Sequence, residues 1–248
     1  MPKVEKRTEG EVSQSVELNF SREKAFECLF EFVRPIRFFS CGTWWGGGTC
    51  FLVCLKGKYY AITARHVLDR QGVEYNEARI MLSGCSFQIP ILGHFFPQSS
   101  VLERYHLDVL VYRLDLFHYK LMTGRGVAVL NLEEQFHPAD RVKGGSACVV
   151  GYPVTDDRYD YEKEIINDHI SLRYGKVSDS VMESPIYCVE SSRPTYPTNG
   201  ISGGPVLIAH DGVVKLIGVI VRASDSSGAV HFLDATVLLA AIFNFEGY

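Results

Sequence analysis

Residues 199–205 read Asn-Gly-Ile-Ser-Gly-Gly-Pro, and this stretch is the most distinctive pattern in the chain. Its serine, Ser202, stands among glycines, which permit backbone angles and close approaches that larger residues do not tolerate. Two segments with a histidine and an aspartate precede it: Ile62-Thr63-Ala64-Arg65-His66-Val67 and His106-Leu107-Asp108-Val109-Leu110-Val111. A histidine, an aspartate and a serine therefore follow one another in this order, each beside an apolar segment typical of a β-strand.

These three segments resemble the histidine, aspartate and serine motifs of the trypsin-like (chymotrypsin-fold) serine peptidase family. The resemblance runs from residue 40 to residue 240 and also includes GGTCFLV, VKGGSACVVGYP, RYGKVSD and LIGVIV. It is stronger to bacterial HtrA-like protease domains than to digestive trypsins, and we expect no PDZ domain. The resemblance implies an all-β fold of two packed six-stranded antiparallel β-barrels, with the site in the cleft between them.

The resemblance also implies a serine endopeptidase that cleaves protein or peptide substrates through an acyl-enzyme, with no metal or cofactor. A serine hydroxyl needs an adjacent base, and a buried carboxylate keeps a histidine base in the correct tautomer. Ser202 is accordingly predicted as the nucleophile, His66 as general base and then acid, and Asp108 as the residue that orients His66. The N–H groups of Gly200 and Ser202 match the family's oxyanion hole. His106 is the nearest rival to His66, because in a strand it would share a face with Asp108.

Two residues near the serine depart from the secreted trypsins. Ile201 stands where those enzymes carry an aspartate that pairs with a new N-terminus, so we expect no activation by N-terminal cleavage. Control is instead expected from an activating protein partner, a loop rearrangement or oligomerisation. Tyr196 stands at the base of the S1 pocket and offers no negative charge to Lys or Arg side chains. A small or medium apolar P1 residue is therefore predicted.

Val221, Arg222 and Ala223 match the strand that forms one wall of the substrate site in this family. Together with Tyr196 they are the predicted substrate-binding residues. Val221 replaces a serine that commonly supports the catalytic aspartate, so Asp108 is expected to have fewer hydrogen bonds. Arg222 is predicted either to favour acidic substrate residues or to lie exposed on the barrel rim.

Composition excludes several other classes of function. The 248 residues have a net charge of −4, whereas a nucleic-acid-binding domain would be basic, so no nucleic-acid partner is expected. The sequence has no apolar run long enough to span a membrane, and the first ten residues lack the apolar region of a secretory signal. The seven cysteines are an odd number, and Val67 replaces the disulfide cysteine that usually follows the histidine in secreted relatives. Free thiols and a cytoplasmic location are therefore predicted.

Three parts of the chain are predicted: an N-terminal extension over 1–35, a first barrel over 36–130 with His66 and Asp108, and a second barrel over 131–248 with Ser202. The extension is expected to form an amphipathic helix over Ser21–Val33, stopped by Pro35, that plugs a barrel end or docks a partner.

Short strands are expected through the rest of the chain, and two turns mark hairpins. These turns are Lys56-Gly57-Lys58 and His210-Asp211-Gly212. A C-terminal helix over Asp234–Phe243 is predicted, with Asp234 as its cap. The residues from Asp115 to Ala139 are expected to cross between the two half-domains.

Two other functions compete with the peptidase. The first is a catalytically silent pseudoprotease that keeps the fold as a protein-binding module, which Ile201 and Val221 leave open. The second is a structural zinc site formed by Cys41, Cys50 and Cys54, although no matching pair of ligands follows them.

Overall fold

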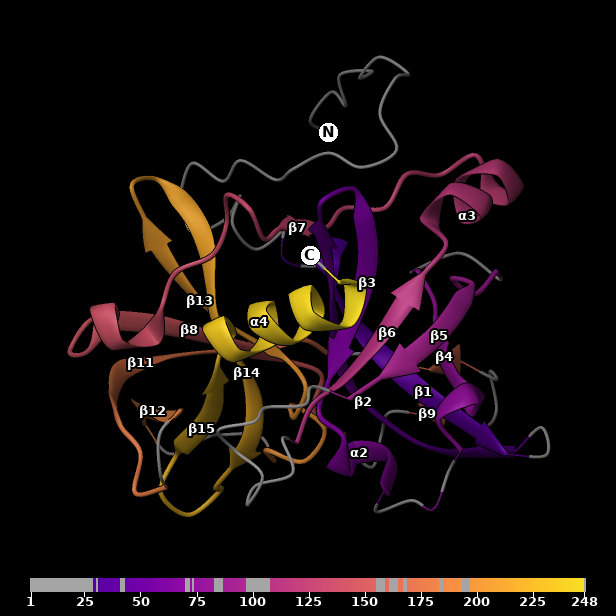
Figure 1. The fold of residues 1–248 in the computed structure, drawn as a ribbon. Coiled ribbons are helices and arrows are strands. Elements are labelled where there is room, and N and C mark those ends of the chain that lie inside the picture. Colours follow the sequence, from indigo (N-terminus) through magenta and orange to yellow (C-terminus); the bar gives the residue numbers. More distant parts are fainter. Residues whose placement is uncertain are drawn as a thin grey trace, which may run out of the picture.

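The computed structural model describes residues 29, 31–40, 43–69, 72, 74–82, 87–96, 108–154, 159–160, 165–166, 169–182, 185–192 and 197–247. Two β-sheet systems lie side by side, one from the first half of the chain and one from the second half (Figure 1). The predicted all-β class with two barrel-like sheets is confirmed.

The first sheet is a six-stranded path in the order β4-β1-β2-β3-β6-β5, and a short seventh strand pairs with β2. Its end strands approach each other, because Met81 bridges to Gln88 and the Ile89 N–H donates to Ile80 O at 2.8 Å. The sheet therefore curls into a half-barrel. Its strands are β1 Val33–Ser40, β2 Thr43–Leu55, β3 Lys58–Thr63, β4 Ala78–Ile80, β5 Ile91–Phe95, β6 Leu110–Leu114 and β7 Leu130–Asn131.

The second sheet is a closed antiparallel barrel in the order β11-β12-β15-β14-β13-β8. Its strands are β8 Ser146–Gly151, β11 Ser171–Asp179, β12 Ile186–Ser191, β13 Pro205–His210, β14 Val213–Ala223 and β15 Ala229–Asp234. A separate small hairpin joins β9 Tyr159–Asp160 to β10 Ile165–Ile166.

Both predicted tight hairpins are confirmed. Lys56 and Gly57, between β2 and β3, have φ values of 48° and 73°. Asp211 and Gly212, between β13 and β14, have φ values of 53° and 75°. Positive φ at both central residues is typical of the two-residue hairpin turn whose twist matches the flanking strands.

The C-terminal helix α4, Ala235–Glu246, is also confirmed. The Asp234 side chain accepts the Thr236 N–H at 2.7 Å, and Gly247 ends the helix in the left-handed conformation. A helix that was not predicted, α3 Leu116–Thr123, has the same signals at its ends, with Asp115 as N-cap and Gly124 as C-cap.

Most of the predicted N-terminal helix lies outside the described residues. Leu29, Glu31 and Phe32 are helical, but Val33, its predicted last residue, begins β1. Pro35 does not stop the chain there, because it lies inside β1, before the stretch that pairs with β4. Proline is tolerated at such a position, where a neighbouring strand does not need its missing N–H.

A continuous apolar core joins the two sheets. One buried cluster contains Phe51 and Ile62 of the first sheet together with Leu207 and Leu216 of the second barrel and Leu238 of α4. A second cluster fills the closed barrel itself. Because the first cluster spans the interface, the sheets are held in a fixed relation by close packing.

Helix α4 extends from the second barrel to the first sheet (Figure 1). At its end the Glu246 carboxylate, only 4% exposed, binds Lys58 Nζ, accepts the Tyr60 hydroxyl at 2.8 Å and lies 3.8 Å from the Arg113 guanidinium. Phe245 stacks on Phe95 of β5. A glutamate is unfavourable at the C-terminal end of a helix dipole, so these contacts are what stabilise Glu246 there.

Replacing Glu246 with Gln is expected to lower the free energy of unfolding at pH 7 by about 2 kcal/mol, since hydrogen bonds to charged groups contribute about 1.5–3 kcal/mol. Burial alone raises the pKa of Glu246, but the hydrogen bonds from Lys58 and Tyr60 and the charge of Arg113 outweigh it and hold the pKa below its ordinary value. A carboxylate with a lowered pKa stabilises the fold above its unfolded pKa of about 4.3 and loses this contribution as the pH falls further.

Urea unfolding of the wild type and Glu246→Gln at pH 7 and at pH 3.5 checks this expectation. The difference between the two proteins should shrink at the lower pH. Glu134→Gln, at an exposed position, is the matched control and should change stability at neither pH. An equal difference at both pH values would contradict the assigned role of the Glu246 charge.

Candidate active site

Strands β3 and β6 bring His66 and Asp108 together. Thr63, the last residue of β3, pairs with Leu110, the first residue of β6, so the segments next to them lie side by side. The His66 backbone N–H donates to Asp108 Oδ1 at 2.7 Å, and His66 Nδ1 contacts Asp108 Oδ2. Because a carboxylate oxygen accepts hydrogen bonds, this contact places the ring proton on Nδ1 and leaves Nε2 as a proton acceptor.

The short helix α2, His66–Asp69, is anchored behind His66 by charged and aromatic side chains. The Arg65 guanidinium pairs with Asp69 at 2.9 Å and lies 4.6 Å from the centre of the Phe96 ring. The Tyr75 hydroxyl donates to Asp69 at 2.5 Å, and Leu68 is fully buried. These contacts restrict the direction in which the imidazole can point.

Ser202 lies in the turn that enters β13, on the second barrel. Gly200 and Gly203 in this turn have φ values of 92° and 85°, which favour glycine. A side chain at Gly203 would also overlap Thr49 O and Thr63 Oγ1 of the first sheet. The serine turn is therefore in direct backbone contact with the first sheet.

The four consecutive carbonyl groups of residues 199–202 all accept hydrogen bonds. Their donors are, in order, Val154 N at 2.7 Å, Thr49 Oγ1 at 2.7 Å, Gly204 N at 3.0 Å and Thr49 N at 3.3 Å. In contrast, the N–H groups of Gly200 and Ser202 have no hydrogen-bond partner within the described parts of the chain. Within the same residues the turn thus leaves these two backbone donors unused, as it does the N–H of Asn199.

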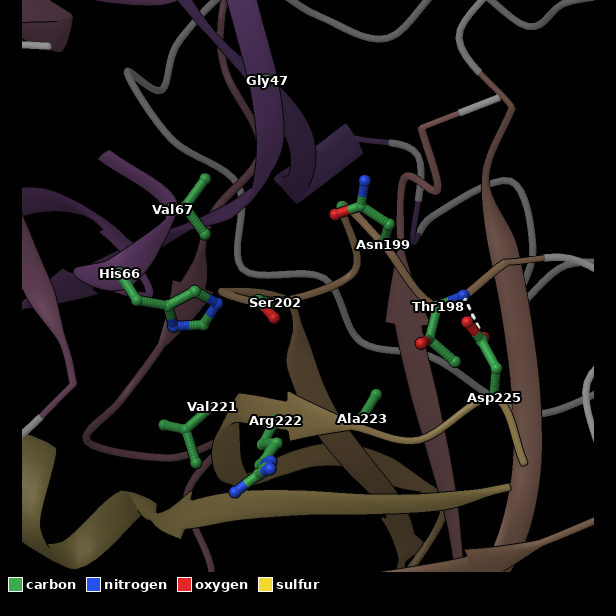
Figure 2. Close-up of a pocket in the computed structure, with 11 residues that line it drawn as sticks. Gly47, His66, Val67, Thr198, Asn199, Ser202, Val221, Arg222, Ala223 and Asp225 are labelled. Carbon is green, nitrogen blue, oxygen red and sulfur yellow. Dashed lines mark hydrogen bonds between the residues drawn. The ribbon is translucent and has the colours of Figure 1, made fainter. Parts of the chain in front are cut away.

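A cavity of about 360 Å³ connects the two halves of the site. The His66 ring points across it toward Ser202 (Figure 2). Among the described residues the Ser202 hydroxyl has no hydrogen-bond partner, and such contacts are often long before a substrate binds. The cavity is lined by Gly47, His66, Val67, Thr198, Asn199, Gly200, Ser202, Val221, Arg222, Ala223 and Asp225.

All three predicted residues of the wall strand, Val221, Arg222 and Ala223, lie on this cavity. Arg222 and Ala223 pair with β15 on one edge, and Val221 lies at a bulge in this pairing. Strand β13 begins opposite Val219, so the other edge of Val221–Ala223 has no paired strand among the described residues. Arg222 is exposed and is the cross-strand neighbour of His231. Burial and the charge of Arg222 together hold the pKa of His231 below its ordinary value.

Asp108 has a hydrogen bond at both carboxylate oxygens although Val221 offers none. Both come from His66, one from its backbone and one from its ring, and the described residues supply no third. Among the described residues, His66 is therefore the only hydrogen-bond partner of the Asp108 carboxylate.

Tyr196 and His106, two residues singled out from the sequence, lie outside the described residues. The cavity also contains residues that were not predicted as site residues, among them Thr198 and Asp225. Asp225 lies at the end away from His66, where its Oδ1 accepts the Thr198 N–H at 2.6 Å (Figure 2). Asp225 begins the turn that follows β14, and only the fold brings this turn to the cavity.

Ile201 is fully buried in the core of the second barrel. Gly151 makes room for it, because a Cβ at Gly151 would lie 2.7 Å from Ile201 Cβ. An apolar side chain thus anchors the serine turn at the position where secreted trypsins use an ion pair.

The described cysteines, Cys50, Cys54, Cys148 and Cys188, are free thiols. Burial raises the pKa of Cys50 far above its ordinary value and that of Cys148 to about 12, which opposes the thiolate form that metals need. The described residues contain no cluster of His, Cys, Asp and Glu that could hold a metal, and Cys41 lies outside them. Within the same residues, no helix has the length and apolar character of a membrane span.

Solved structures with a similar fold include two bacterial or microbial proteases. One is the protease Anisep from Arthrobacter nicotinovorans, with a TM-score of 0.57 and 17% identity over 87% of this chain and 94% of that one. The other is the thermostable serine protease AL20 from an extremophilic microorganism, with a TM-score of 0.55 and 13% identity over 85% of this chain and 94% of that one. At these identities they show the fold alone.

No curated protein matches the sequence. A family model described as a trypsin-like peptidase domain matches residues 48–219, which is more than half of the chain and spans both sheets. The family predicted from the three motifs is therefore confirmed, and the chain belongs to the trypsin-like peptidase family.

Proposed function

We propose that the protein is a serine endopeptidase in which Ser202 attacks the substrate carbonyl, His66 transfers the proton and Asp108 orients His66. The observation that carries the proposal is the Asp108–His66 pair, whose ring points across one cavity toward Ser202. In the first step Nε2 of His66 takes the Ser202 proton while Oγ bonds to the carbonyl carbon. The same proton then goes to the leaving amine, and water releases the acyl group.

The N–H groups of Gly200 and Ser202 are the proposed oxyanion donors. They belong to a turn whose carbonyls are all engaged, and neither has a hydrogen-bond partner among the described residues, so both are available to a developing negative charge. Loss of one such donor typically costs about 100- to 1000-fold in rate.

The substrate is proposed to be an extended protein segment that pairs with the free edge of Val221–Ala223. Main-chain pairing of this kind gives affinity without demanding one sequence. Arg222 adds a preference, because it is a cation on the cavity wall with no carboxylate partner among the described residues. We propose that it favours substrates with an acidic side chain near the scissile bond.

A cytoplasmic location is proposed from the cysteines and from Val67. In the structure Val67 packs against Gly48, so closely that a Cβ built on Gly48 would lie 2.6 Å from Val67 Cγ1. No disulfide joins the described cysteines. This supports the proposal of a cytoplasmic protein that does not rely on disulfides. Control by a protein partner or a loop rearrangement stays a prediction of the sequence.

Treatment with a fluorophosphonate probe tests the proposed nucleophile. The wild type is expected to gain one phosphonyl group by intact mass, because the probe needs both an activated serine and oxyanion donors. Ser202→Ala should gain none. Ser146→Ala, at an exposed serine of β8, is the control and should react like the wild type. No adduct in the wild type would favour the pseudoprotease, and an adduct that persists in Ser202→Ala would exclude this nucleophile.

Profiling of a peptide library tests Arg222. Arg222→Glu is expected to lower kcat/KM for peptides with Asp or Glu next to the scissile bond by about three- to tenfold, since an exposed pair of opposite charges contributes up to about 1 kcal/mol and charge reversal adds a comparable repulsion. Peptides with Lys at the same position should gain. Arg222→Gln separates charge from shape and should remove the acidic preference without creating a basic one. An unchanged profile in both variants would refute the role of Arg222.

A further inference from the structure

We propose that Thr49, on β2 of the first sheet, is the positioning residue that sets the direction of both oxyanion donors on the second barrel. The inference rests on the proposed function for its catalytic consequence. Its structural part rests on contacts of Thr49 with the serine turn. Thr49 does not touch the reacting atoms, and it acts only through the backbone of residues 200–203.

Thr49 is fully buried and spans the gap between the two sheets. Its hydroxyl donates to Gly200 O at 2.7 Å and accepts the Tyr152 N–H at 2.7 Å. A threonine hydroxyl has one proton, and Tyr152 N can only donate. The proton of Thr49 is therefore directed to the Gly200 carbonyl.

These contacts fix the backbone on both sides of Gly200. In a trans peptide the N–H and C=O point in opposite directions. The Asn199 carbonyl shares a peptide plane with the Gly200 N–H and accepts a hydrogen bond from Val154 N, so the Gly200 N–H points away from Val154. The Gly200 carbonyl, in the following peptide plane, accepts a hydrogen bond from Thr49 Oγ1. With both neighbouring peptide planes held, Gly200 stays at its φ of 92° and its N–H keeps one direction.

The same residue holds the backbone at Ser202. The Ile201 carbonyl accepts the Gly204 N–H at 3.0 Å, and the Ser202 carbonyl accepts the Thr49 N–H at 3.3 Å. The peptide planes before and after Ser202 are thereby held as well. Thr49 thus supplies two of the four donors that orient the turn, one from its side chain and one from its backbone.

Thr49 is itself held in place on the first sheet. The Thr63 hydroxyl donates to Thr49 O at 2.7 Å, and Gly203 packs directly on this pair. Thr63 is the last residue of β3, and the chain continues from it to His66. The same residue holds Thr49 through the hydrogen bond to its carbonyl. The position of the base and the direction of the donors depend on the same pair of strands, so a shift of one sheet against the other would disturb both.

The test compares steady-state kinetics of the wild type, Thr49→Val, Thr49→Ser and Thr63→Val. Valine keeps the β-branched shape but removes the hydroxyl. For Thr49→Val we expect kcat to fall about 10- to 100-fold with KM changed less than about threefold, because the donors act on the transition state. Thr49→Ser restores the hydroxyl and should return kcat to within about threefold of the wild type. Thr63→Val removes an equally buried hydroxyl that does not reach Gly200, and its kcat should fall far less.

Amide hydrogen exchange over residues 197–204 provides a readout that needs no activity. Exchange is expected to be faster in Thr49→Val, clearly less affected in Thr63→Val and restored in Thr49→Ser. A wild-type kcat in Thr49→Val, no rescue by Thr49→Ser, or an equal loss in Thr63→Val would overturn the inference and leave the Ser202 peptidase standing. If the wild type shows no Ser202-dependent activity, the proposed function fails instead. The exchange data then decide alone: unchanged exchange in Thr49→Val overturns the positioning role, and faster exchange rescued by serine supports it.

Discussion

The contact between Thr49 of β2 and the turn around Ser202 is the constraint on which the rest of the site depends. Here the backbones of the two sheets approach so closely that Gly203 has no room for a side chain. Such an approach requires that the polar groups on both sides be paired, because a buried unpaired carbonyl or amide is costly. The hydroxyls of Thr49 and Thr63 meet this requirement.

This contact joins two sheets that contribute different residues to the site. The first sheet supplies His66 and Asp108 through the pairing of β3 with β6, and the second barrel supplies Ser202 through the turn before β13. Their relative position is fixed by the shared core, by helix α4 and by the pairing at Thr49. Ile201, buried in the second barrel, holds the turn from the other side without any charged partner.

Much of this could be predicted from the sequence, because it depends on local patterns. The three motifs predicted the family, alternating and apolar segments predicted the strands, and Lys56-Gly57 and Asp211-Gly212 predicted hairpins that the structure contains. Asp234 correctly marked the start of α4. Helix α3 could have been found from Asp115 and Gly124, but its exposed Phe117 and Leu121 obscure the apolar pattern that a surface helix usually shows.

What could not be predicted depends on tertiary contacts. Nothing near Thr49 in the sequence indicates that its hydroxyl meets a carbonyl 151 positions away. Asp225 likewise reaches the cavity only because its loop follows β14. Val33 and Pro35 were placed at the end of a helix, whereas pairing with β2 draws them into a strand.

The central claim is that the serine turn is already arranged to bind an oxyanion and that Thr49 maintains this arrangement. The most direct measurement is a crystal structure of the protein after reaction with a fluorophosphonate. The account predicts phosphorus on Ser202 Oγ, a phosphoryl oxygen about 2.7–3.1 Å from the nitrogens of both Gly200 and Ser202, and an intact bond from Thr49 Oγ1 to Gly200 O. A phosphoryl oxygen that points to solvent, or a Gly200 carbonyl turned away from Thr49, would contradict it.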